Sequence, residues 1–180
     1  MLTAQQYERA ASLICECDLL RRQENIPGGE ISIGLWVGSE VTPNHVVSDN
    51  PDLESAESIL NKLQSGFVDE VKSSPVQLST CPYCGEVLEP QNAYNIQKRH
   101  FKTHCPNPAC PFHEDLPVVT VDDDIYDRKP TLLIGTIDKF ARLAWEEKTK
   151  SIFAEDGIGF PPDLLIQDEL HLISGPLGSI

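Results

Sequence analysis

Apolar residues in the first quarter of the chain recur with two different periods, which predict a helix followed by a strand. From residue 2 to about 24 they fall three and four positions apart, the spacing of one helix face: Tyr7, Ala10, Ile14 and Cys17. The apolar residues at 31, 33, 35 and 37 alternate, and Trp36 adds bulk on the other side. This pattern predicts a strand over 31–37, buried on at least one face, with a loop over 38–44 after it.

The helical spacing returns after residue 50. Asn50 as the cap and Pro51 as the first helical residue predict a second helix, which Gly66 ends. A polar connector follows over 69–80, and residues 81–113 hold four cysteines and three histidines, which indicates a separate module. The acidic residues at 122–124 and 127 indicate a solvated loop.

The last fifty residues return to an alternation of strands and helices. A strand is predicted over 131–136, a helix over 138–148, a connector over 149–162, and another apolar strand from residue 164. Strands that alternate with helices indicate an α/β domain with a mainly parallel sheet.

Charge narrows the possible functions. The chain carries 28 acidic and 14 basic side chains, a net charge of −14, which argues against a free-standing basic nucleic-acid module but not against a local basic patch. No run of apolar residues approaches the ~20 that a membrane span needs, and the N-terminus lacks a secretory pattern. We therefore expect a cytoplasmic location. In that reducing compartment, paired cysteines bind metal ions more often than they form disulfides.

Two pairs of cysteines have the spacing of a structural metal site. Cys81 and Cys84 form one short turn, Cys105 and Cys110 form another, and twenty residues separate the pairs. Four thiolates are what a closed tetrahedral zinc site needs, and Gly85 allows the tight turn that presents the first two. The alternative is four buried or redox-active cysteines. Four sulfurs suffice, so the nearby histidines are left out of the predicted ligand set: His100, His104 and His113.

Other polar and thiol side chains have weaker interpretations. The densest positive patch lies at 98–104 and could contact phosphates or be an ordinary exposed loop: Lys98, Arg99, His100, Lys102 and His104, with Phe101 and Tyr94 nearby. Cys15 and Cys17 are two residues apart, so they do not share a helix face, and packing in the core explains them better than chemistry.

An acidic pair follows the last predicted strand. In open parallel sheets, ligands lie beyond the carboxyl ends of strands. Asp168 is therefore placed to hold Mg²⁺, and Glu169 could orient and deprotonate a water that attacks a phosphate. Two exposed acids at the end of a strand are the alternative.

The ordered motifs resemble a known family. The strand that leads into Asp168-Glu169-Leu170-His171 is similar to motif II, the DExH box, of superfamily 2 helicases. Residues 132–143 resemble their motif Ib, and residues 2–6 the end of motif Ia. Together with the cysteine pairs, the set most resembles the helicase subunit of the DISARM phage-defence systems.

This resemblance implies a RecA-like (P-loop NTPase) domain that uses ATP and Mg²⁺ to move along nucleic acid, with DNA expected, and possibly other defence-system subunits as partners. Asp168 would bind magnesium, Glu169 would be the catalytic base, and His171 would couple nucleotide state to nucleic acid. Thr136 and Arg142 would lie near the nucleic-acid backbone, beside contacts from Lys98, Arg99 and Lys102.

The P-loop of that family is missing here, because none of the eight lysines follows a glycine. We therefore expect an internal piece of a larger protein, inactive alone. Its expected parts are a first part of a RecA-like domain at 1–75, an inserted zinc ribbon at 76–118 that a chelator should unfold, and a second part at 119–180.

Rival functions follow from the same residues. The main one is a zinc-ribbon module that binds nucleic acid or protein without catalysis. A metal-dependent nuclease is a faint match, through Asp163, Glu169 and His171, but lacks the lysine of that motif. A zinc protease is weaker still, because Pro117 stands where the second histidine of H-E-x-x-H belongs.

Overall fold

The fold is a mixed α/β arrangement around a sheet of three parallel strands in the order β4-β1-β5. A computed structural model describes the chain except for residues 1, 51, 142–146, 156 and 168–180. In the sheet, β1 (Ile33–Trp36) lies between β4 (Val118–Val119) and β5 (Leu132–Gly135), with Ile33 opposite both Val118 and Leu132. The expectation of an α/β fold with a parallel sheet is confirmed.

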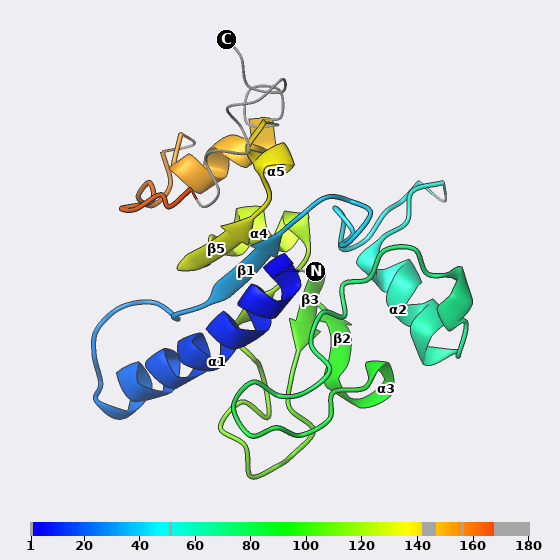
Figure 1. The fold of residues 1–180 in the computed structure, drawn as a ribbon, viewed down its shortest axis with the longest axis horizontal. Helices are drawn as coiled ribbons and strands as arrows, with labels where there is room; N and C mark the ends of the chain where they lie inside the picture. The colour runs from blue at the N-terminus through cyan, green and yellow to red at the C-terminus, as the bar shows by residue number, and fades with distance from the viewer. Residues whose placement is uncertain (1, 51, 142–146, 156, 168–180) are drawn as a thin grey trace.

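The two faces of β1 belong to different packing clusters, because side chains alternate along a strand. Ile33 and Leu35 pack with α1 (Leu2–Gln23) in the larger core. Trp36 packs on the other face, against Ile125 and Tyr126 of α4 (Asp122–Arg128). Figure 1 shows the two helices on opposite sides of the sheet, so β1 is a fully covered central strand.

The long connection between β1 and β4 carries several further elements. It holds α2 (Ala56–Gln64), the 3-10 turn η1 (Val68–Glu70), α3 (Pro90–Ala93) and an antiparallel hairpin. The hairpin strands are β2 (Tyr94–Gln97) and β3 (His100–Thr103). An insertion between strands of the sheet was expected, but its core is not separate. Buried residues of the insertion share one hydrophobic cluster with α1 and β1: Cys81, Leu88, Tyr94, Phe101, Cys105, Cys110, Phe112 and Leu116.

Two expectations for the first helices need correction. On the predicted face of α1, Tyr7 and Ile14 are buried, but Ala10 and Cys17 are only half-buried. Ala11, Cys15 and Asp18 are buried in their place. The second helix begins at Ala56 instead of after Asn50. Ser55 caps it through a reciprocal pair of hydrogen bonds with Ser58, whereas the side chain of Asn50 accepts from the Asp52 N–H in a separate turn (3.0 Å).

The acidic run at 122–124 is not a solvated loop. It forms the first turn of α4, and Asp122 and Asp124 are only 3% and 1% exposed. Carboxylates are favourable there because the first turn of a helix has unpaired N–H groups and a positive dipole end. Arg128 in the last turn completes the charge pattern of a helix.

The C-terminal elements follow the prediction only in part. The helix expected over 138–148 is described as α5 (Ile137–Ala141), followed after the gap by the 3-10 helix η3 (Glu147–Phe153), part of the expected connector. Residues 164–167 are not a strand: they pair with none of the described strands, and Leu164, Leu165 and Ile166 are exposed. An apolar run needs a neighbouring strand to complete its hydrogen bonds. Among the described helices, none is long and apolar enough to cross a membrane.

Candidate functional site

The first pair of cysteines lies on a tight turn that is held by backbone hydrogen bonds. The Cys81 N–H donates to the Glu86 carbonyl (2.7 Å), and the Gly85 N–H donates to the Cys81 carbonyl (2.9 Å). Gly85 has a φ of +79°, a conformation that residues with a Cβ adopt only at a cost. This turn brings the thiols of Cys81 and Cys84 to one side of the backbone.

The second pair lies on a turn of similar design. The Cys105 N–H donates to the Phe112 carbonyl, and the Cys110 N–H to the Asn107 carbonyl, both at 3.0 Å. The side chain of Asn107 also accepts from the Ala109 N–H (3.0 Å), which fixes the middle of the turn.

The two turns bring all four predicted ligands together. The Sγ atoms of Cys81, Cys84, Cys105 and Cys110 lie within 4.8 Å of one another. Cys81 is 3.9 Å from Cys110 and Cys84 is 3.5 Å from Cys105, with no disulfide among them. Zinc–sulfur bonds of about 2.3 Å place the sulfurs of a tetrahedral site about 3.8 Å apart. The cluster therefore has the composition and the size to bind a metal ion such as zinc.

The environment of these thiols also suits a cation. Burial raises the pKa of the Cys110 thiol to about 11 and that of Cys105 further. Burial acts in the same direction on Cys84, but hydrogen bonds from the Glu86 N–H and the neighbouring thiols outweigh it and hold its pKa below the usual value. Buried thiols lose their protons readily only when a positive charge binds them. A bound metal ion would therefore stabilise the thiolate forms of these cysteines.

The three histidines of this region lie outside the cluster of possible ligands. The Nδ1 atom of His113 lies 2.8 Å from the Cys105 carbonyl oxygen, and His100 pairs with Asp124 (2.6 Å). Burial lowers the pKa of His104, the third histidine. Their interactions are compatible with the prediction that leaves them out of the ligand set.

Helix α1 packs directly against the second cysteine turn. Phe112 is fully buried, lies edge-on to Tyr83 (5.6 Å between ring centroids), and is covered by the Arg22 guanidinium group at 5.1 Å. Cys15 of α1 is also buried in the same core. The cluster thus lies between the two turns and the first helix.

The acidic first turn of α4, which the sequence did not predict, links the hairpin to the sheet. Asp124 accepts from the Phe101 N–H (2.8 Å) and pairs with His100, and Asp123 accepts from the Val46 N–H (3.3 Å). Asp122 forms a buried ion pair with Lys139 of α5, which also donates to Asn44 (3.1 Å). A signal for this helix is present in the sequence: acidic residues in the first turn and an arginine in the last turn are typical of a helix.

The residues predicted to contact nucleic acid differ in exposure and in pairing. Lys98 and Arg99 are exposed at the tip of the β2–β3 hairpin, whereas Lys102 is paired with Asp115. Thr136 follows β5, where its N–H donates to the Trp36 carbonyl (3.1 Å) and its hydroxyl oxygen is buried without a hydrogen-bond partner among the described residues. Arg142, Asp168, Glu169 and His171 lie outside the described residues.

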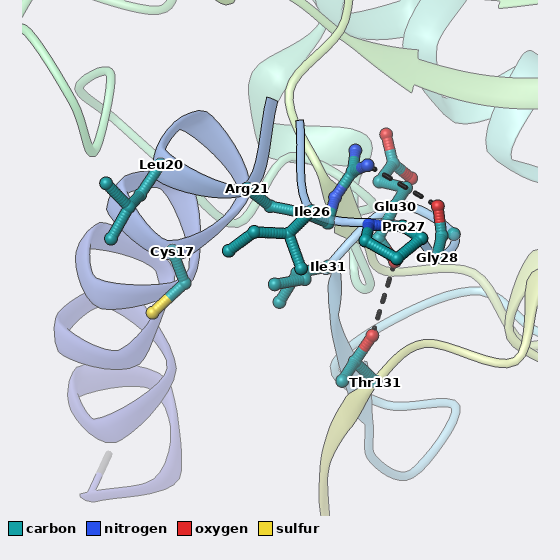
Figure 2. A pocket seen from close by; sticks show the side chains of 10 residues that line it. Cys17, Leu20, Arg21, Ile26, Pro27, Gly28, Glu30, Ile31 and Thr131 are labelled. Atoms are coloured by element: carbon teal, nitrogen blue, oxygen red, sulfur yellow. Dashed lines mark hydrogen bonds between the residues drawn. The ribbon is translucent and has the colours of Figure 1, made fainter. Parts of the chain in front are cut away.

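Cavities in the described part of the chain include one beside α1 and one beside α4. One, of about 600 Å³, lies between the end of α1 and the segment before β1, and is lined by residues that include Leu20, Arg21, Ile26 and Thr131 (Figure 2). It is at the amino ends of β1 and β5, the opposite edge from the usual ligand site of a parallel sheet. The other, of about 480 Å³, lies between the hairpin tip, α4 and η3.

Comparison with known proteins gives one informative similarity. No family model matches the chain. The chain is 35% identical to DISARM protein DrmA from Bacillus paralicheniformis (strain ATCC 9945a / NCIMB 11709 / CD-2), in an alignment of 217 positions that covers all of this chain. The chain spans 19% of the length of that relative. It is therefore related along its whole length to one part of a much longer DISARM protein.

Proposed function

We propose that this chain is part of the motor domain of an ATP-driven nucleic-acid translocase in a phage-defence system. The similarity to DISARM protein DrmA over the whole chain carries this proposal. The resemblance of residues 132–143 and 168–171 to helicase motifs points to nucleic acid as the substrate, which we take to be DNA. The DExH motif at 168–171 supplies the chemistry that the proposal needs.

The fold agrees with this proposal. A parallel sheet with helices on both faces is the framework of nucleotide-driven motors, and in such sheets the reactive groups follow the carboxyl ends of strands. Gly135 ends β5 at that edge, and Thr136 connects it to α5. Gly135 is in close contact with Trp36, because a Cβ there would come within 3.3 Å of the Trp36 carbonyl oxygen.

The acidic residues of the motif take different roles in the proposed reaction. Asp168 would hold Mg²⁺, which with ATP supplies the electrophilic phosphoryl group. Glu169 would orient the attacking water and accept its proton, and His171 would connect this site to the bound strand. Thr136 and Arg142 would contact the strand backbone. The phosphates themselves need a P-loop, which these 180 residues do not contain.

The test is ATP hydrolysis by the longer protein that includes this chain. Glu169→Gln removes the base but keeps the size and most hydrogen bonds of the side chain. We expect nucleic-acid-stimulated turnover to fall at least ~100-fold, the usual contribution of a general base. Glu155→Gln, at an exposed glutamate in the same part of the chain, should leave turnover unchanged. Equal turnover in the Glu169→Gln variant and the wild type would refute the motor proposal.

The metal cluster has a structural role in this proposal. Four cysteine ligands leave no open coordination position, so a bound zinc ion would hold the two turns together without acting on substrate. Zinc has no redox chemistry in proteins, so it can bind four free cysteines without oxidising them.

A second function is a metal-stabilised binding module without catalysis. The observation that favours it is the exposed, unpaired segment at 164–167, which does not form the strand that normally precedes a DExH motif. In that case Asp168→Ala in the longer protein should change neither nucleotide binding nor nucleic-acid binding, whereas the motor proposal expects it to weaken Mg²⁺-dependent nucleotide binding.

A further inference from the structure

The tip of the β2–β3 hairpin has a backbone conformation that does not suit its residues. Lys98 and Arg99 form the two-residue loop, and both have positive φ values, +52° and +65°. Two left-handed residues in a two-residue hairpin loop are the pattern of a type I′ turn, which strongly prefers Asn-Gly. Lysine and arginine carry a Cβ that makes this conformation unfavourable, so turn stability does not explain their presence.

The strained turn is held firmly from both sides. On the β3 side, the buried carboxylate of Asp124 accepts from the Phe101 N–H and pairs with His100, directly after the turn. Four residues of each strand are in antiparallel register. Strain of this kind persists only where surrounding contacts fix it, and it concentrates at functional positions.

Neither basic side chain is paired with an acid among the described residues. Both are exposed, and among the described residues neither forms an ion pair or hydrogen bond. In contrast, the other lysine of the hairpin, Lys102, is paired with Asp115. In a chain with twice as many acidic as basic residues, an adjacent pair of unneutralised cations is available for an external anion.

A groove opens beside this tip. It has a volume of about 480 Å³ and is bounded by the hairpin tip, α4 and η3, which contributes Lys148. Two acidic residues of α4, Asp123 and Asp127, also line the groove. Asp123 already pairs with Lys148 (3.2 Å) and with His45 (3.2 Å). The carboxylates that line the groove disfavour an anion inside it, so contacts are expected with the exposed side chains of Lys98 and Arg99.

We propose that Lys98 and Arg99 form a phosphate-contacting surface for the backbone of nucleic acid. A guanidinium fork and an ammonium group side by side are suited to successive phosphates of one strand. Because the turn is already ordered, little conformational entropy is lost on binding. This inference rests on the proposed action on nucleic acid, and it gives the inserted hairpin a binding role besides its structural one.

The test replaces the tip by the sequence that the turn prefers. In the zinc-loaded 180-residue chain, the double variant Lys98→Asn/Arg99→Gly relieves the strain and removes two cations. If the residues serve binding, the variant unfolds at the same or a higher temperature than the wild type. Its affinity for a fluorescein-labelled single-stranded DNA 20-mer should fall ~10-fold or more, and the slope of log K against log salt should fall by about 1.4.

The matched control changes the charge equally elsewhere. Lys72→Asn/Lys150→Asn removes two exposed cations that do not line the groove, and we expect it to bind nearly as the wild type does. Equal losses in both double variants, no binding by the wild type at low salt, or displacement of the DNA by poly-glutamate of equal charge would each overturn the inference. None of these results affects the ATP turnover on which the motor proposal depends, because that is measured with Glu169→Gln.

Discussion

Asp18 shows how much a single buried carboxylate organises in this molecule. It is fully buried on α1, forms ion pairs with Arg21 and Arg22, and accepts from the Ile31 N–H (2.9 Å) just before β1. Arg22 in turn covers Phe112 next to the cysteine turn. Asp18 therefore links the end of α1 and the start of the central strand and, through Arg22, reaches the cysteine cluster.

This arrangement predicts a specific loss of stability in acid. Burial alone would raise the pKa of Asp18, but the Ile31 N–H and the two guanidinium groups outweigh it and hold the pKa below its usual value. A depressed pKa contributes stability that is complete above the unfolded-state value of about 3.9 and is lost as the pH falls through the folded-state value.

Asp18→Asn should therefore lower the free energy of unfolding by about 1–3 kcal/mol at pH 7, because both arginines lose their charged partner. Below pH 4 its stability should depend less on pH than that of the wild type. Urea unfolding at pH 7, 4 and 3 measures both effects, with the exposed Asp49→Asn as the control. A variant that loses stability in acid as steeply as the wild type would contradict this explanation.

At the scale of elements, β1 is the strand that the rest of the fold encloses. It is covered on both faces and paired on both edges, so its backbone is closely approached from several sides. A Cβ on Gly34 would lie 2.6 Å from Cγ of Pro130 and 2.8 Å from Cδ1 of Leu133. Only glycine fits at this position without movement of the segment that leads into β5.

Gly34→Ala should accordingly destabilise the chain by about 1–3 kcal/mol, the usual cost of adding a methyl group to a filled core. Gly38→Ala is the matched control, because a Cβ at Gly38 has no atom within 4 Å. Thermal unfolding of the two variants beside the wild type measures the difference. The same stability in both variants would show that the Pro130 segment moves aside freely.

The elements also show which parts of the fold a sequence can reveal. Helix α1, strand β1 and strand β5 follow from local periodicity, and the four cysteines come together as their spacing predicted. The prediction for Asp122 and Asp124 is wrong because their partners, Lys139 and His100, are distant in sequence, and without partners an acidic run looks solvated. The strand expected at 164–167 was wrong for a related reason: its apolar pattern is genuine, but a strand depends on a neighbour that local pattern does not supply.

The same limits apply to the candidate site. Spacing identified the four cysteines that could bind a metal ion, since two short turns fix their own geometry. The hairpin tip was recognised only as a charged patch, because the positive φ values of Lys98 and Arg99 are visible only in the structure. The groove beside it brings together residues from the hairpin, α4 and η3, which no local pattern relates.

The whole molecule is held together by a core that joins the inserted ribbon to the sheet. Cys81, Cys105 and Cys110 belong to the same buried cluster as Ile33 and Leu35 of β1. Figure 1 shows α1 running past the central strand toward the loops that carry the cysteines. A metal ion in the cluster would therefore stabilise α1 and the sheet as well as the two turns, since metal-binding free energy is folding free energy in such sites.

The most direct test of this account is hydrogen exchange on the zinc-loaded chain before and after removal of the metal by a strong chelator. We predict one zinc per chain in the wild type and in Cys17→Ser, and loss of zinc in Cys84→Ser. On chelation, the backbone amides of α1 should lose protection together with those of residues 81–113. An α1 that stays protected while only 81–113 exchanges, or a chain that is fully folded without metal, would contradict the account.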